Sequence, residues 1–170
     1  MKAWTGMLMV ALAPLGTTGC GGNSSVPESA GAGELVAEGT VRQVGSAPTV
    51  TTRIETGDGP IVVVGPLASE IARAAGAVAR VHGISPGDSG PKAIRAESYN
   101  LVSVDGMSPL VGVLELEDDR IVLRTEDGQR VELIGGSARM REATGSKVWV
   151  TTRDDGRSIV RWGILREQGQ

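Results

Sequence analysis

The sequence predicts an all-β protein with a minor helix, arranged as two tandem five-stranded barrels. Valine, isoleucine, leucine and threonine recur in short runs from residue 34 onward, and Gly, Asp and Pro separate these runs. Such a pattern is typical of strands joined by turns. Several runs alternate apolar and polar residues, which gives one apolar and one polar sheet face. The same order of runs occurs twice along the chain, so we expect two copies of one structural unit.

The first copy contains five expected strands and one helix. Asp58-Gly59 predicts a tight hairpin between the second and third strands, because glycine enters positive-φ geometry without a Cβ clash. Leu67, Ile71 and Ala75 then recur at helical spacing, which predicts a short capping helix before the fourth strand. The expected strands span 39–42, 50–54, 61–64, 77–81 and 94–104.

The second copy keeps this order. Ile121, Leu123 and Val131 fall at period two, and Asp127-Gly128 predicts the matching hairpin. The segment between the third and fourth strands is shorter and more polar than its counterpart, so we expect no more than a turn of helix there. The expected strands span 112–115, 120–125, 130–134, 147–150 and 158–165, and the helical segment 137–144.

Three strands, a helix and two further strands form the element order of an OB-fold barrel. In this order the chain resembles the small bacterial OB-fold domains of periplasmic and surface lipoproteins, many of unknown activity. The resemblance implies OB-fold-like barrels at 34–105 and 106–167, and it brings no catalytic residues. The same strands also fit one larger sandwich or a ten-stranded barrel. Units of about 65 residues bury only a modest core, so we expect packing between the copies to add stability.

The N-terminus has the layout of a secretory signal peptide. Lys2 precedes an apolar stretch, 7–15, and small residues lead to Cys20, the only cysteine. The stretch is too short for a membrane span of about 20 apolar residues. The segment ending at Cys20 resembles the lipobox of bacterial lipoproteins, although Thr17 stands where leucine is usual. The resemblance implies removal of residues 1–19 and lipidation of the Cys20 sulfur.

A tether and an envelope location follow from this resemblance. Residues 20–33 are rich in Gly, Ser and Ala, which favours a flexible linker between anchor and barrels. Gly21, in place of aspartate, resembles the sorting pattern for the outer membrane. We therefore expect a lipid-anchored protein of the cell envelope, at the outer membrane or the periplasmic face, with a membrane partner through its lipid.

Charge and aromatic content argue against nucleic acid as a partner. The net charge is −3 and phenylalanine is absent, whereas single-strand binders combine a basic groove with aromatic platforms. Trp149 and Trp162 are nevertheless candidates for a binding patch. Val148 and Val150 flank Trp149 and should take the opposite sheet face, which leaves Trp149 outside its own barrel. Its simpler role is packing against the other copy; a sugar or peptide platform is the alternative.

The polar residues predict neither a metal site nor a cofactor site. The carboxylates form no EF-hand loop and are more simply turn residues. His82 has no cysteine near it that could complete the ligands of a zinc site. We expect this histidine to be exposed at the end of a strand. Gly87-Asp88-Ser89-Gly90 resembles a serine protease motif, but His82 is too close to Ser89 for that family. The carboxylates in question are Glu115, Glu117, Asp118, Asp119, Glu126, Asp127, Asp154 and Asp155.

The expected function is therefore non-enzymatic. The preferred hypothesis is a lipid-anchored envelope protein whose tandem barrels bind or scaffold a protein or glycan partner. The alternative is a periplasmic stress protein that binds a small molecule or a cation through the loops of one barrel. Fold alone does not choose between them.

Overall fold

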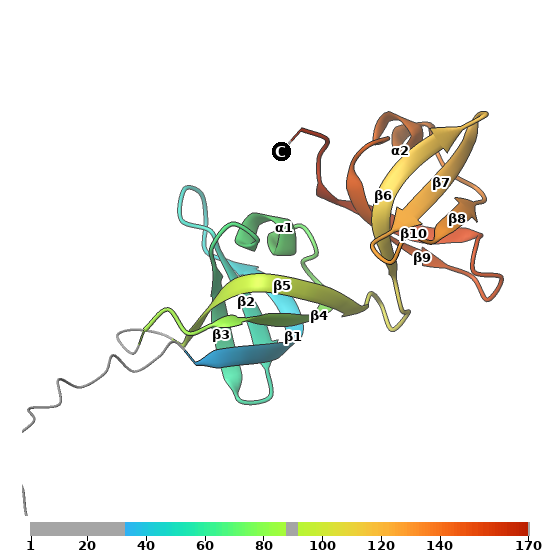
Figure 1. The fold of residues 1–170 in the computed structure, drawn as a ribbon. Coiled ribbons are helices and arrows are strands. Elements are labelled where there is room, and N and C mark those ends of the chain that lie inside the picture. Colours follow the sequence, from blue (N-terminus) through green and yellow to red (C-terminus); the bar gives the residue numbers. More distant parts are fainter. Residues whose placement is uncertain (1–32, 88–91, 170) are drawn as a thin grey trace, which may run out of the picture. The chain divides into compact units, whose positions relative to one another are not determined.

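Two five-stranded β-sheets and two short helices make up the part of the chain that the computed structural model describes, residues 33–87 and 92–169 (Figure 1). The prediction of an all-β protein with a minor helix is thus confirmed. The expected signal peptide, Cys20, the expected tether up to residue 32 and Ser89 lie outside the described residues. Two separate sheets form, so the alternative of a single ten-stranded barrel is wrong.

The first sheet closes into a barrel in the order β1-β2-β3-β5-β4. Every neighbouring pair is antiparallel except β3 and β5, which run parallel at Val62–Val64 and Ala93–Arg95. Helix α1 lies between β3 and β4 in the chain and contacts β1 and β2. The elements are β1 (Glu34–Val44), β2 (Thr51–Thr56), β3 (Gly59–Val64), α1 (Ala68–Ala72), β4 (Val78–Ile84) and β5 (Ala93–Ser103).

The second sheet repeats this order but stays open. Its strands follow β10-β9-β6-β7-β8, and one parallel bridge, Ile134 to Ser158, joins the ends where the first sheet has a full pairing. Full strand pairing therefore closes only the first sheet, because β8 ends at Leu133 and does not pair along β10. The elements are β6 (Leu110–Glu117), β7 (Arg120–Thr125), β8 (Arg130–Leu133), α2 (Ala138–Glu142), β9 (Lys147–Thr152) and β10 (Ile159–Arg166).

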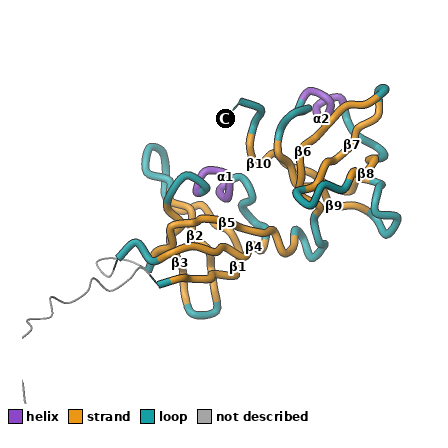
Figure 2. The backbone as a smooth tube through the Cα atoms, viewed as in Figure 1, coloured by secondary structure: helices purple, strands orange, loops and turns teal. Residues whose placement is uncertain are grey.

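The two helices are equally long, contrary to the expectation that the second would be shorter (Figure 2). The Ser137 side chain caps α2 by accepting a hydrogen bond from the Met140 backbone N–H at 3.3 Å. Met140 itself is fully buried, so one apolar residue fixes this polar helix to its sheet. A cap and one anchor compensate for the weak apolar pattern that suggested a single turn.

Two glycines occupy matching positions in the first strand of each sheet, which indicates that both sheets bend at the same place. Gly39 of β1 and Gly112 of β6 each lie against a carbonyl of the next strand. A Cβ would stand 2.0 Å from the Glu55 oxygen in one case and 2.3 Å from the Arg124 oxygen in the other. Only glycine leaves room for this close approach.

The hydrophobic residues form two clusters, and the first extends beyond its own barrel. The second cluster is built from strands β6 to β9 and α2, with Leu114, Leu123 and Met140 fully buried. The first cluster fills the barrel around Val41, Ile54 and other residues, but it also contains Leu165 of β10. The two sheets lie within one compact part of the chain, residues 32–170, and Leu165 of the second sheet belongs to the core of the first.

Candidate functional site

The side of the second sheet that faces away from its own cluster packs against the first cluster. Val111, Trp149 and Leu165 provide this contact, one from each of β6, β9 and β10. Val148 and Val150, on either side of Trp149, are fully buried in the second cluster. The alternation along β9 therefore places the Trp149 indole in contact with the first unit.

Gly163 makes room for this indole. It lies opposite Trp149 on β10, and a Cβ at Gly163 would stand 2.7 Å from the Trp149 Nε1 atom. Nε1 is buried and has no hydrogen-bond partner among the described residues. Trp149 therefore contributes apolar packing here.

Trp162 belongs to the other face of the same two strands. It lies opposite Val150, and directly paired residues of antiparallel strands share a face. It packs with Ile164 at the margin of the second cluster. The sequence analysis named both tryptophans as candidates for one binding patch. The structure puts them on opposite faces, although one cavity has both in its lining.

A polar group centred on the buried Glu70 joins the two units and is called the Glu70 cluster: Glu70, Tyr99, Glu126, Lys147 and Arg166. Glu70 of α1 is 5% exposed. One of its carboxylate oxygens accepts a hydrogen bond from the Tyr99 hydroxyl at 2.6 Å and lies 2.9 Å from the Lys147 Nζ. The other lies 3.4 Å from Arg166 Nη1. Three elements outside α1 thus converge on one carboxylate.

Lys147 is the second centre of this cluster. Its Nζ also lies 2.9 Å from a Glu126 carboxylate oxygen and 5.0 Å from the centroid of the Tyr99 ring. At that distance the ring face attracts the ammonium group. The second unit therefore supplies a cation that covers the aromatic ring and the carboxylate of the first.

The pKa values follow from burial and partners together. Burial alone would raise the pKa of Glu70, but hydrogen bonds from Tyr99 and Lys147 and the charges of Lys147 and Arg166 hold it below its ordinary value. Burial alone would lower the pKa of Lys147, whereas Glu126 and Glu70 raise it overall. Burial and the Glu70 carboxylate both raise the pKa of Tyr99. At neutral pH Glu70 and Lys147 are charged and Tyr99 is neutral.

Sequence reasoning missed this cluster. One signal was present, because Glu70 stands three residues after Leu67 and four before Ala74, on the apolar side of the predicted helix. Its partners Lys147 and Arg166 come from distant strands, and no local pattern connects them with α1.

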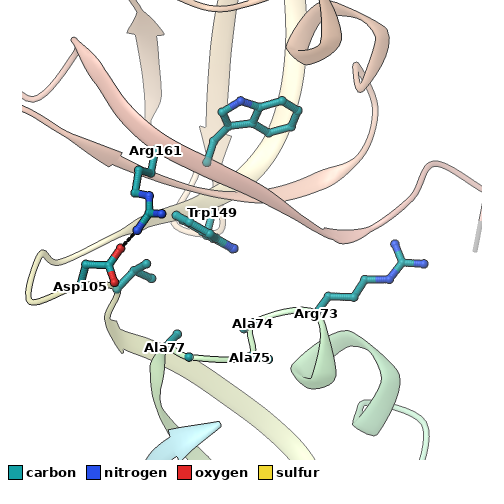
Figure 3. A pocket seen from close by; sticks show the side chains of 10 residues that line it. Arg73, Ala74, Ala75, Ala77, Asp105, Trp149 and Arg161 are labelled. Atoms are coloured by element: carbon teal, nitrogen blue, oxygen red, sulfur yellow. Dashed lines mark hydrogen bonds and ion pairs between the residues drawn. The ribbon is translucent and has the colours of Figure 1, made fainter. Parts of the chain in front are cut away.

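Two adjoining cavities lie beside Trp162 and are called the Trp162 groove. One measures about 270 Å³ and the other about 470 Å³, and they share Arg73 and Trp162 in their linings. The smaller one continues along Ala74–Ala77 to Asp105, Trp149 and Arg161 (Figure 3). The larger one is also lined by Ser137, Arg139, Gly163, Ile164 and Glu167.

Arginines dominate the polar lining of the Trp162 groove. Arg161 forms an ion pair with Asp105, drawn as a dashed line in Figure 3. Arg73 lies 3.1 Å from a Glu167 carboxylate oxygen. Arg139 is exposed on α2 and forms no ion pair within the described part of the chain. Its guanidinium group is thus open to an added carboxylate.

The acidic residues of the second sheet serve turns and surface pairs. Asp155 accepts hydrogen bonds from the backbone N–H groups of Arg157 and Ser158, and together with the Ser158 hydroxyl these lower its pKa to about 2. Glu115 pairs with Arg124 at 2.6 Å and with Arg130 at 3.0 Å. These contacts give Asp155 and Glu115 structural partners.

His82 is half-buried inside β4, so the expectation of an exposed histidine at a strand end is wrong. The strand continues to Ile84 because β1 pairs with it along Glu34–Gly39. Within residues 33–87 and 92–169, no group of three or more His, Cys, Asp or Glu side chains is placed to hold a metal ion.

No family model matches the chain, and no curated protein shows significant similarity to it. None of the described helices has the length and apolar character needed to cross a bilayer.

Proposed function

We propose that this chain is a non-enzymatic, lipid-anchored envelope protein that uses two OB-fold-like units as one rigid module to bind a protein or glycan partner. The strand order of both sheets, with a helix before the fourth strand, supports the OB-fold assignment. The shared cluster and the Glu70 cluster support rigidity, because apolar packing and the buried ion pair between Glu70 and Lys147 both join the two units.

The observation that carries the proposal is the Trp162 groove. It combines two indoles with three arginines, and such residues are enriched where proteins bind partners. Exposed concave surfaces with aromatic and arginine side chains favour recognition over packing. The groove therefore serves as the binding surface in this proposal.

One experiment tests binding. The full-length chain is immobilised and exposed to a glycan panel and to isolated envelope proteins, beside Trp162→Ala and Val160→Ala variants. Val160 is 45% exposed on the same strand and lies outside both cavity linings, so it is a matched control. We expect a bound partner that Trp162→Ala loses and Val160→Ala keeps. Thermal stabilisation by a small molecule or cation, without any macromolecular partner, would support the alternative of a stress protein.

A second experiment tests the anchor. Intact mass spectrometry is applied to the chain purified from bacterial membranes, beside a Cys20→Ser variant from the same cells. We expect a lipid-modified chain that begins at Cys20, and loss of both the modification and the cleavage in the variant. An unmodified chain that retains Met1 would contradict the lipoprotein assignment.

A further inference from the structure

Tyr99 and Trp162 occupy the same position in the two units. Tyr99 lies opposite Val81 in the β4–β5 pair, and Trp162 lies opposite Val150 in the β9–β10 pair. The helices correspond as well, because the Ala77 N–H donates to the Ala74 carbonyl just as the Ser146 N–H donates to the Ala143 carbonyl. This alignment matches the fully buried Ile71 with the fully buried Met140, and Glu70 with Arg139. In each unit the aromatic residue therefore lies near the same position of the helix: Tyr99 contacts Glu70, and Trp162 lines one cavity with Arg139.

The two copies of this position differ in what covers them. In the first unit the Tyr99 ring and Glu70 are covered by Lys147, whose side chain is 14% exposed. In the second unit a cavity of about 470 Å³ lies beside Trp162. Lys147 covers the first position and leaves a cavity of about 180 Å³ beside Tyr99, whereas the larger cavity leaves the second position open to an external group.

The chemistry of the second position is reversed relative to the first. The first presents a carboxylate and receives cations from Lys147 and Arg166. The second has Arg139 at the position of Glu70, with Arg73 in the same cavity lining. A group that carries a carboxylate is complementary to this arrangement.

The backbone beside the groove offers a second kind of contact. Trp162, Gly163 and Ile164 are consecutive residues of β10 and all line the larger cavity. Within the described residues, β10 pairs only with β9 and, at its start, through the single bridge of Ser158. Its other edge therefore presents backbone N–H and C=O groups that an extended peptide pairs with.

We propose that the Trp162 groove binds an extended acidic peptide segment of a partner protein, which adds to the free edge of β10 and places a carboxylate at Arg139. This deepens the proposed binding function and rests on it. The free edge favours a peptide over a glycan, because a glycan has no backbone amides to pair with a strand. Three arginines against Asp105 and Glu167 give the groove a positive surplus in a chain of net charge −3.

The test uses a fluorescein-labelled octapeptide of alternating valine and glutamate, titrated with the full-length chain by fluorescence anisotropy. Matched peptides replace glutamate with glutamine or carry N-methyl groups at alternate residues. The matched variants are Arg139→Gln and Arg141→Gln, since both arginines are exposed on α2 but only Arg139 lines the groove.

We expect saturable binding that Arg139→Gln and the glutamine peptide each weaken about tenfold, the loss of one charge-assisted hydrogen bond. Arg141→Gln should bind as the parent chain does, and N-methylation should abolish binding because it removes the strand's donors. Circular dichroism confirms that each variant is folded.

Other outcomes overturn the proposal. Equal loss in Arg139→Gln and Arg141→Gln would indicate non-specific charge attraction. Self-association of the chain that competes with the peptide would make a second copy the occupant. A glycan or protein captured in a Trp162-dependent manner, with no binding of the acidic octapeptide, would overturn this inference and leave the proposed function in place. If neither the peptide nor any partner binds, both fail.

Discussion

The first unit is closed and covered, and the second, built in the same strand order, is open and exposed. In the first, β3 and β5 pair in parallel and Lys147 covers the Tyr99 ring. In the second, one bridge replaces that pairing and a cavity lies beside Trp162. The comparison teaches that a tandem repeat need not use both copies alike. The first copy provides the apolar surface against which Val111, Trp149 and Leu165 of the second copy pack.

The test with the largest expected effect removes the Glu70 carboxylate, which pairs with Lys147 and Arg166 of the second unit. Glu70→Ala leaves the half-buried Lys147 and the Tyr99 hydroxyl without their shared partner, and we expect a loss of about 3 kcal/mol in the free energy of unfolding. Urea denaturation measures this loss. Glu167→Ala is the control, because this carboxylate is 57% exposed and its pair with Arg73 contributes well under about 1 kcal/mol. Equal effects would show that the cluster does not join the units.

The next test concerns the apolar contact between the units. Leu165 of β10 is 1% exposed and belongs to the first cluster, so Leu165→Ala should cost about 3 kcal/mol. Because the core is shared, we expect one unfolding transition in both the parent and the variant. Leu116→Ala, 44% exposed in β6, should stay within about 0.5 kcal/mol of the parent. Two separated transitions in the parent chain would contradict the shared core.

A smaller effect is expected where β10 makes room for Trp149. Gly163→Ala places a Cβ within 2.7 to 2.9 Å of three indole atoms, an overpacking that costs about 2 kcal/mol. Shifts in Tm measure the cost. Combining this change with Trp149→Leu should recover part of the stability, because the smaller side chain relieves the clash. Additive losses in the double variant would show that the two residues do not touch.

The smallest effect is the pH dependence of the Glu70 cluster. The folded-state pKa of Glu70 lies below its ordinary value of 4.5, so its contribution is present above pH 4.5 and is lost as pH falls through the folded pKa. The pKa of Lys147 lies above 10.5, so its contribution is present below that pH and is lost as pH rises through the folded pKa. Stability should therefore fall at both extremes. In Glu70→Gln the loss of folding stability at acid pH should be smaller than in the parent chain. An unchanged loss would show that other carboxylates cause it.

Local patterns predicted the fold class and much of the strand layout. The alternation around Trp149 placed its flanking valines in the second cluster, and the Asp-Gly pairs marked both hairpins. Closure of a sheet was beyond prediction, because it depends on whether β8 and β10 meet, and these strands are distant in the sequence.

The candidate site was less accessible to prediction than the fold. Composition singled out Trp162 but not Arg139, since an exposed arginine on a short helix looks like any surface residue. Register also separated Trp149 from Trp162, because neighbouring strands pair Trp149 with Gly163. Contacts of this kind depend on tertiary pairing, which local periodicity does not report.

Leu165 has a consequence for how the chain is made. A chain folds progressively as it is synthesised or exported, and its early strands become available first. The first barrel cannot complete its core until β10 arrives, although its own last strand ends at Ser103. Such long-range contacts slow folding. The first unit thus keeps an incomplete core until the last strand of the polypeptide has emerged.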